Sequence, residues 1–163
     1  NLELASGVVV AARGGDFDGD GNLDAALVFG GGSGVLTVVD GSDPKKLALL
    51  QPVEVGLLPI GMACADLNAD GKDDVVLTGP GEVRIFLSTG KGSFLAVGGE
   101  RFAGLAGPVA VWPSQKGRPG KIAVLSLKGR AWLMSLPAPP RKAPAAPRPA
   151  PTSSPAEGGK KEG

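Results

Sequence analysis

The stretch GGDFDGDGNLDAALVFG, residues 14–30, places four aspartates within nine residues and then runs directly into an apolar segment. The four carboxylates stand two, two and four residues apart, so they repel one another unless a cation lies between them. A hard divalent ion with oxygen ligands removes this repulsion. Ca²⁺ suits the set best, because it takes roughly six to eight oxygens in flexible geometry. The stretch therefore predicts a calcium loop followed by a β-strand.

The same pattern returns at an offset of 50 residues, where residues 66–74 read DLNADGKDD. Both loops carry Gly at the sixth position, Gly21 and Gly71, where a tight turn disfavours a side chain. The recurrence argues against a merely solvated Asp/Gly turn. We expect two Ca²⁺ sites that stabilise the fold, with ligands Asp16, Asp18, Asp20 and Asp24 in the first loop, Asp66, Asn68, Asp70 and Asp74 in the second, and the backbone carbonyls of Asn22 and Lys72.

Short apolar runs flank both loops in the same order, and such runs between Gly, Pro and Asp turns are typical of strands. A third copy lacks carboxylates in its loop, PSQKGRPG at residues 113–120. The expected strands are 8–12, 25–29, 35–39 and 47–50 in the first unit, 60–65, 75–78, 83–87 and 94–97 in the second, and 108–112, 121–125 and 131–134 in the third.

These units predict an all-β fold of three tandem antiparallel β-sheets, which are blade-like repeats of the β-propeller type. We place repeat one at 1–55, repeat two at 56–104 and a degenerate third repeat at 105–136. Residues 137–163 are rich in Pro and Ala and have almost no large apolar side chains, so we expect a disordered C-terminal tail or linker.

The composition excludes several kinds of chemistry. The chain has no histidine and no tyrosine, so catalytic triads and His-ligated zinc are ruled out. The single cysteine, Cys64, stands between two alanines and is expected to be a small core residue rather than a nucleophile. No apolar run is long enough to span a bilayer.

The loops differ from an EF-hand, which needs a bidentate Glu at the twelfth position and flanking helices. Here that position is Leu27 or Leu77, and strand-like runs follow. The segments GGDFDGDGNLDAALVFG and ACADLNADGKDDVVLTG instead resemble the FG-GAP/VCBS repeats of integrin-α-type β-propellers, over roughly residues 5–136. The resemblance implies calcium held in a β-hairpin loop and a secreted or cell-surface role in adhesion, recognition or scaffolding.

Closed propellers use about four to eight blades, so three units leave the ring incomplete. We expect a homo-oligomer, missing propeller blades from another chain, or closure of the three sheets among themselves. The predicted function is a non-enzymatic, calcium-stabilised extracellular module for adhesion, self-assembly or scaffolding. The alternative is a carbohydrate-binding propeller or lectin, or an accessory binding domain of a larger secreted protein, and an enzyme is a third class.

Two features bear on these alternatives. Trp112 and Trp132 are expected to pack in the core or between blades rather than to form a sugar platform. Residues 101–156 contain no acid, so this basic stretch is either a surface for polyanions such as acidic polysaccharide or ordinary solubilising charge. Nucleic acid fits poorly, because the basic residues are not interleaved with exposed aromatic ones.

Overall fold

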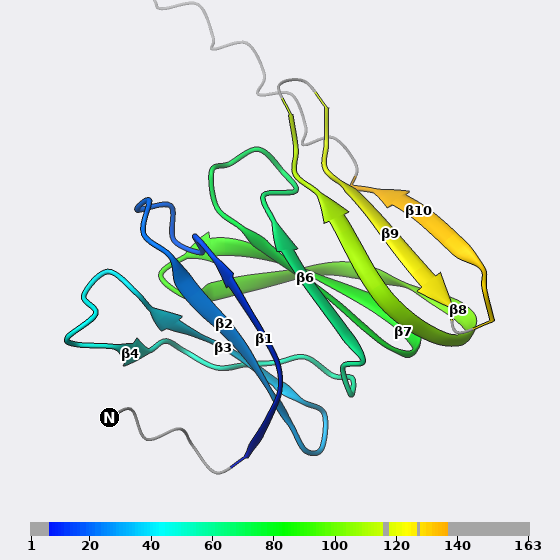
Figure 1. The fold of residues 1–163 in the computed structure, drawn as a ribbon, viewed down its shortest axis with the longest axis horizontal. Helices are drawn as coiled ribbons and strands as arrows, with labels where there is room; N and C mark the ends of the chain where they lie inside the picture. Colours follow the sequence, from blue (N-terminus) through cyan, green and yellow to red (C-terminus); the bar gives the residue numbers. More distant parts are fainter. Residues whose placement is uncertain (1–6, 116–117, 127, 137–163) are drawn as a thin grey trace, which may run out of the picture.

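The computed structural model describes residues 7–115, 118–126 and 128–136, so the predicted tail at 137–163 lies outside the described residues. The described chain consists of β-strands, turns and loops, and it contains no helix that is long and apolar enough to cross a membrane (Figure 1). The strands are β1 (Val8–Gly15), β2 (Asp24–Gly30), β3 (Val35–Asp40), β4 (Ala48–Leu49), β5 (Val53–Glu54), β6 (Gly61–Ala65), β7 (Asp74–Gly90), β8 (Ser93–Trp112), β9 (Lys121–Ser126) and β10 (Ala131–Ser135).

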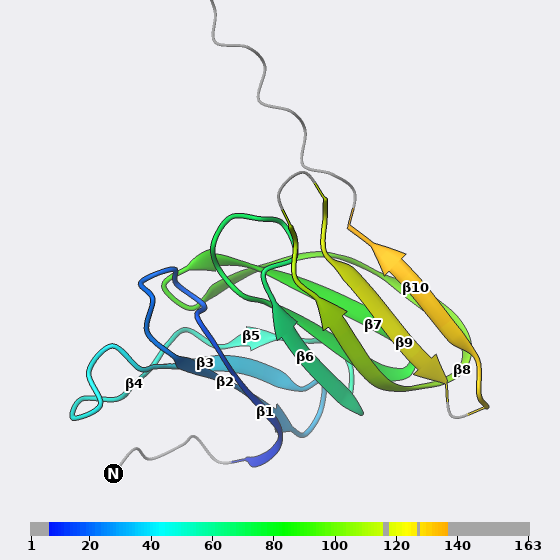
Figure 2. The ribbon, with the colours of Figure 1, turned by 45° about the horizontal axis from the view of Figure 1, so that its top comes forward.

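Every strand pair is antiparallel, which confirms the predicted all-β antiparallel class. The first sheet has the order β1-β2-β3-β4, with β5 also pairing β3. The order β10-β9-β8-β7-β6 follows, and Figure 2 shows β6 and β7 between the first sheet and the β9–β10 hairpin. Among the described residues the sheets do not close into a ring or barrel.

The long strand β8 belongs to two sheets. Its first part pairs with β7, and its last part, up to Trp112, pairs with β9. The predicted boundary between residues 104 and 105 therefore lies inside β8, and the second and third repeats share one strand. We accordingly treat the molecule as three sheets in a row: β1–β5, then β6, β7 and the first part of β8, then the last part of β8 with β9 and β10.

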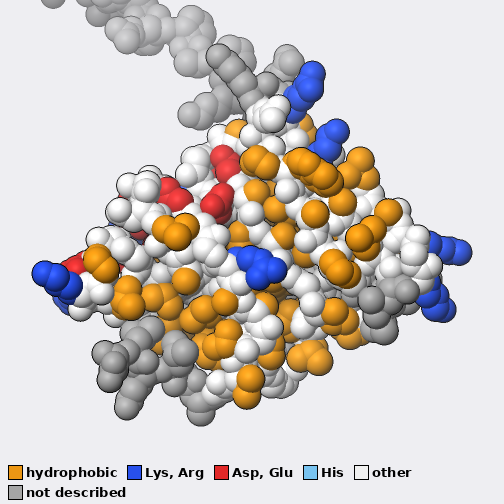
Figure 3. Space-filling view, in the orientation of Figure 1, with side chains coloured by type: hydrophobic (Ala, Val, Ile, Leu, Met, Phe, Trp, Pro, Cys, Tyr) orange, Lys and Arg blue, Asp and Glu red, His pale blue; other side chains and the backbone are white. Residues whose placement is uncertain are grey.

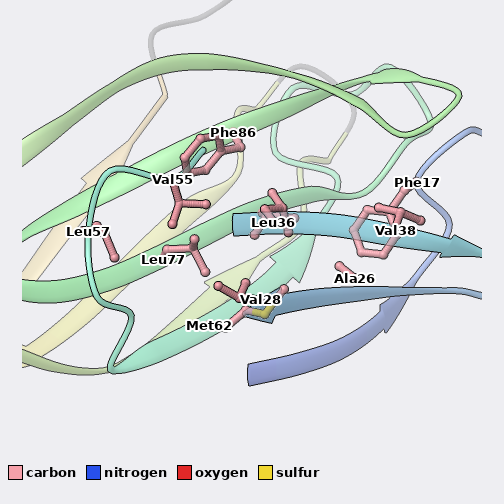
Figure 4. Close-up of a cluster of buried hydrophobic side chains, with 11 residues drawn as sticks. Phe17, Ala26, Val28, Leu36, Val38, Val55, Leu57, Met62, Leu77 and Phe86 are labelled. Atoms are coloured by element: carbon pink, nitrogen blue, oxygen red, sulfur yellow. The ribbon is translucent and has the colours of Figure 1, made fainter. Parts of the chain in front are cut away.

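The first hydrophobic cluster joins the first sheet to the second. Along β2, buried residues alternate with half-buried ones, as expected when only one face is covered by another sheet. Figure 4 shows inward side chains of the first sheet, such as Val28 and Leu36, meeting Leu77 and Phe86 of β7. The buried members are Phe17, Ala26, Val28, Leu36, Val38, Val55, Leu57, Met62, Val75, Leu77 and Phe86.

The middle sheet is buried on both faces. Val75 and Leu77 belong to the first cluster, whereas the intervening Val76 belongs to a second cluster with Ile122 and Val124 of β9. Successive side chains of a strand point to opposite faces, so the run VVLT in β7 supplies both interfaces. This arrangement explains why Val75, Val76 and Leu77 follow one another with no polar residue between them.

The two tryptophans differ in their surroundings. Trp132 is half-buried and packs on Phe102 with ring centroids 4.6 Å apart, as expected for packing within the fold. Trp112 does not pack in the core, because it is 52% exposed on the outer face of the third sheet. That face has no further sheet against it among the described residues, so the ring stays open to solvent.

Candidate metal centre

The first acidic loop, residues 16–24, folds around the carboxylate of Asp16. Asp16 Oδ1 accepts a hydrogen bond from the Gly19 amide at 2.7 Å, and Oδ2 accepts one from the Gly21 amide at 2.9 Å. Gly21 has φ +85°, a conformation that side chains disfavour, which confirms the role predicted for Gly at the sixth position. Each Asp16 oxygen retains a further lone pair for a second partner.

Three of the predicted ligands come together. Asp16, Asp18 and Asp24 each offer a carboxylate oxygen, and these oxygens lie within 4.8 Å of one another. Two oxygens that share one Ca²⁺ at roughly 2.3–2.6 Å lie at most about 5 Å apart, so the spacing fits a common ion. Partial burial and the neighbouring carboxylates raise the pKa of Asp18, which is the electrostatic cost of this cluster without a cation.

Asp24 is the rigid member of the cluster. It is only 4% exposed at the start of β2, and its two oxygens accept hydrogen bonds from the amides of Phe17 at 3.1 Å and Gly41 at 2.9 Å. The carboxylate thus fixes both the entrance of the loop and the segment after β3, whether or not an ion is bound.

Asp20, another predicted ligand, lies outside the cluster of three. Its Oδ2 accepts hydrogen bonds from Asn22 Nδ2 at 2.8 Å and from the Ser42 hydroxyl at 3.1 Å. The bond from Asn22 is the largest of several that hold the pKa of Asp20 below its usual value. Asp20 and Asn22 are both exposed. The loop after β3, which carries Ser42, was not predicted to take part.

The second loop, residues 66–74, repeats the backbone arrangement of the first. Asp66 Oδ1 accepts from the Ala69 amide at 2.6 Å, and Oδ2 accepts from the Gly71 amide at 3.1 Å. Gly71 has φ +85°, the value found for Gly21. Two loops with the same spacing therefore adopt the same turn, and both are candidates for the same ligand.

The charge balance of the second loop is different. Asn68 replaces a carboxylate, and its Nδ2 donates to Asp70 Oδ2 at 3.2 Å. The Lys72 ammonium lies 3.0 Å from the same oxygen. Lys72 was predicted to contribute only its backbone carbonyl, whereas its side chain already offsets part of the loop's negative charge.

Asp74 closes the second loop as Asp24 closes the first. It is fully buried, and its oxygens accept hydrogen bonds from the amides of Leu67 and Ser88, both at 2.9 Å. Burial raises the pKa of Asp74 to about 6, despite these hydrogen bonds. A nearby cation would favour the ionised form.

An apolar side chain at the second position of each loop anchors it to the next sheet. Phe17 is fully buried in the first cluster, edge-on to Phe94 at a centroid distance of 6.1 Å. Leu67 is fully buried in the second cluster. These two side chains, which we call the interface anchors, were not predicted, although an apolar residue at the same place in two polar loops was a usable signal.

Main-chain contacts join each loop to the following unit. The Asp73 amide donates to the Asp16 carbonyl at 2.7 Å, and the Asp16 amide donates to Asp73 Oδ2 at 3.0 Å. The Ser88 hydroxyl donates to the Phe17 carbonyl at 2.5 Å. Figure 3 shows the acidic side chains of the two loops gathered near one another. Asp73 was not a predicted site residue, and its equivalent in the first loop is Leu23, so no repeated pattern marked it.

The second loop makes corresponding contacts with the third unit. The Ser114 amide donates to the Asp66 carbonyl at 2.6 Å, and the Gly120 amide donates to the Leu67 carbonyl at 3.0 Å. A Cβ on Gly120 would lie 2.8 Å from Leu67 Cα, so only glycine fits this approach. The carboxylate-free loop of the third unit is thus hydrogen-bonded to the second acidic loop.

Comparison with protein-family models finds a match to part of the chain. Residues 66–114, from the second acidic loop to the end of the shared strand β8, match the model of the FG-GAP-like repeat. A comparison with curated proteins finds no matching relative. The matched segment contains the loop, its interface anchor and the strands that it joins. The chain therefore carries an FG-GAP-like repeat at residues 66–114.

Proposed function

We propose that this protein is a non-enzymatic, calcium-stabilised β-repeat module that works in adhesion, self-assembly or scaffolding at the cell surface or outside the cell. The observation that carries the proposal is the double role of the first acidic loop, whose turn the second loop repeats. The first loop gathers three carboxylates, and each loop inserts an anchor side chain into the interface with the next sheet. Neutralising the loop therefore stabilises the contact between sheets.

The donor set supports calcium as the ion. Carboxylate oxygens are the ligands that Ca²⁺ takes in flexible geometry, and Asp16 retains free lone pairs beside Asp18 and Asp24. We propose two sites of unequal affinity. The site at Asp16 binds more tightly, because the Lys72 ammonium near Asp70 opposes a second cation in the other loop.

The proposed location follows from the same chemistry. Extracellular calcium modules have dissociation constants of roughly 10⁻⁴–10⁻³ M, so sites of this kind fill outside the cell. A ligand that binds only the folded state stabilises it in proportion to the logarithm of its free concentration. The module is then fully stable where calcium is abundant.

The proposed self-assembly uses the edge of the first sheet. β1 is the terminal strand of its sheet, and Val8, Val9 and Val10 on it are 74%, 37% and 45% exposed. An apolar edge strand is a template for pairing with another chain. We propose that a second copy, or missing propeller blades from another chain, covers this edge.

Thermal unfolding tests the calcium role. Saturating calcium is expected to raise the melting temperature of the chelated protein, and Asp18→Asn is expected to remove part of that rise. Asp43→Asn, which changes an exposed acid outside both loops, is the matched control. Equal melting temperatures in calcium and in chelator would refute the proposal.

Light scattering in millimolar calcium tests assembly. The wild-type chain is expected to associate, and Val8→Asp is expected to yield monomers, whereas Leu47→Asp, on another exposed apolar residue, leaves association unchanged. A monomeric wild-type chain would refute self-assembly. The second candidate function, carbohydrate binding, is favoured by the exposure of Trp112.

A further inference from the structure

A hollow of about 340 Å³ lies on the outer face of the third sheet, beside the exposed ring of Trp112. Trp112 pairs with Lys121 across β8 and β9, and Leu133 of β10 lies on the same outward face. Pro113 and Pro119 complete its apolar wall, and its volume is at the lower end of the range for ligand pockets. The hollow thus has a flat aromatic surface, and proline residues form part of its wall.

The polar groups of the hollow are cationic or neutral. Arg118, Lys121 and Gln115 line it, and no carboxylate does. The ion pairs among the described residues are Lys72–Asp70 and Arg84–Glu82, so Arg118 and Lys121 pair with no described acid. Figure 3 shows Lys and Arg side chains beside hydrophobic ones at this end of the third sheet.

The backbone holds Arg118 in place. The Gln115 amide donates to the Arg118 carbonyl at 3.0 Å, and the Arg118 amide donates to the Gln115 carbonyl at 2.6 Å. The two residues therefore close a small paired turn, and Gly120 beyond it is fixed on Leu67 of the second loop. The cationic border of the hollow is thus attached to the second acidic loop.

We propose that this hollow binds an acidic saccharide, one uronate residue of a polysaccharide, with the sugar ring against Trp112 and its carboxylate at Arg118 and Lys121. A pyranose ring presents an apolar C–H face, which packs on an aromatic plane. A guanidinium binds a carboxylate through two parallel hydrogen bonds. One ring and one anion use the aromatic surface and both cations of the hollow.

Single-stranded nucleic acid also combines rings with negative charge, but it fits this hollow less well. Proteins that bind it use several stacking residues along a long basic groove. Here Trp112 is the one exposed aromatic residue among the described ones, and two cations accompany it. The site is the size of one sugar unit rather than a strand. The proposal supplies a ligand for the binding role above and so rests on the proposed function.

Tryptophan fluorescence of the full chain tests the site directly. Trp132→Phe leaves Trp112 as the single reporter, since the chain has two tryptophans. At fixed free calcium, tri-galacturonate is expected to shift the Trp112 emission in a saturable way, and its methyl ester, which lacks the charges, is expected to bind at least tenfold more weakly. Added salt is expected to weaken the tri-galacturonate signal.

Variants locate the site. Arg118→Gln and Lys121→Gln are each expected to weaken binding about tenfold, the effect of losing one charged hydrogen bond. Lys128→Gln and Arg130→Gln remove the same charge at the far end of the β9–β10 hairpin, and they are expected to leave binding unchanged. Trp112→Ala, followed by calorimetry instead of fluorescence, is expected to abolish binding.

The proposal is overturned if the methyl ester binds equally well, if the Lys128 and Arg130 variants lose as much affinity as the other pair, or if an oligothymidylate binds more tightly than tri-galacturonate. It is also overturned if Trp112→Ala turns an oligomer into a monomer, since another copy then covers the face. Melting curves of the same variants in calcium and in chelator separate the two proposals: normal calcium stabilisation without saccharide binding defeats this inference alone.

Discussion

Replacing the interface anchor of the first loop, Phe17→Ala, is expected to destabilise the protein strongly. The Phe17 side chain is fully buried between the first and second sheets and lies edge-on to Phe94. Truncating a buried Phe to Ala costs about 3–5 kcal/mol, through lost burial and the cavity that remains. The hydrogen bonds of the Phe17 backbone, to Asp24 and Ser88, survive the change, so the loss reports the side chain alone.

The magnitude is large relative to the whole stability of a domain, which is about 5–15 kcal/mol. For a chain of this size each kcal/mol lowers the melting temperature by about 2–4 °C, so we expect a fall of roughly 6–20 °C. Thermal and urea unfolding followed by circular dichroism, in saturating calcium, measure it. Calcium is still expected to raise the melting temperature of the variant, because no ligand has been removed.

Leu23→Ala is the matched control, because Leu23 belongs to the same loop but is 74% exposed. Its replacement is expected to change stability by less than about 0.5 kcal/mol. A Phe17→Ala variant that lost no more than Leu23→Ala would refute the reasoning, since the loop would then not anchor the neighbouring sheet.

The packing between units makes the protein sensitive to changes at Gly120, Asp73 and Cys64. Gly120→Ala places a Cβ 2.8 Å from Leu67 Cα and is expected to lower the free energy of unfolding in urea by about 1–3 kcal/mol. Gly14→Ala is the control, because its Cβ meets only the flexible end of Leu23, and it is expected to be nearly neutral. Equal losses of stability in the two variants would contradict the close approach of Gly120 to Leu67. Asp73→Ala removes the acceptor for the Asp16 amide and is expected to weaken calcium binding, as measured by calorimetry. Asp73→Asn keeps an acceptor oxygen and is expected to bind calcium nearly as well as the wild type. The reverse order of affinities would contradict a role of this hydrogen bond in calcium binding. Burial raises the pKa of the Cys64 thiol to about 12. Iodoacetamide at pH 8 is therefore expected to alkylate Cys64 slowly in calcium and faster in chelator, as measured by mass spectrometry. Rapid alkylation in calcium would contradict the packing of Cys64.

The sequence predicted most strands outside the middle sheet, because β-branched runs alternate with Gly and Asp turns and each run needs only local pairing. It did not predict that the strands expected at 75–78 and 83–87 join in β7, or that those expected at 94–97 and 108–112 join in β8. The strand predicted at 94–97 ends before Gly99, yet Gly99 lies inside β8, where a Cβ would come 1.9 Å from the Val83 carbonyl oxygen. Glycine at this position permits close approach of two backbones, which a composition pattern cannot distinguish from a turn.

The candidate metal centre was likewise predicted only in part. The spacing of the aspartates predicted that Asp16, Asp18 and Asp24 come together, because this depends on the loop alone. The roles of Asp73, Ser88 and Ser42 depend on which segments lie next to the loops, and single-sequence spacing contains no such information. The sequence did not predict the exposure of Trp112, because an apolar strand residue on an uncovered face has the same local pattern as a buried one.

The most direct test of the account is a calorimetric titration of the metal-free chain with Ca²⁺. We expect saturable heat with two sites, of which the tighter is lost in Asp18→Asn, together with a rise in melting temperature over the same concentration range. No heat of binding, or binding that leaves the melting temperature unchanged, would contradict the claim that cations in the two acidic loops hold the three sheets together.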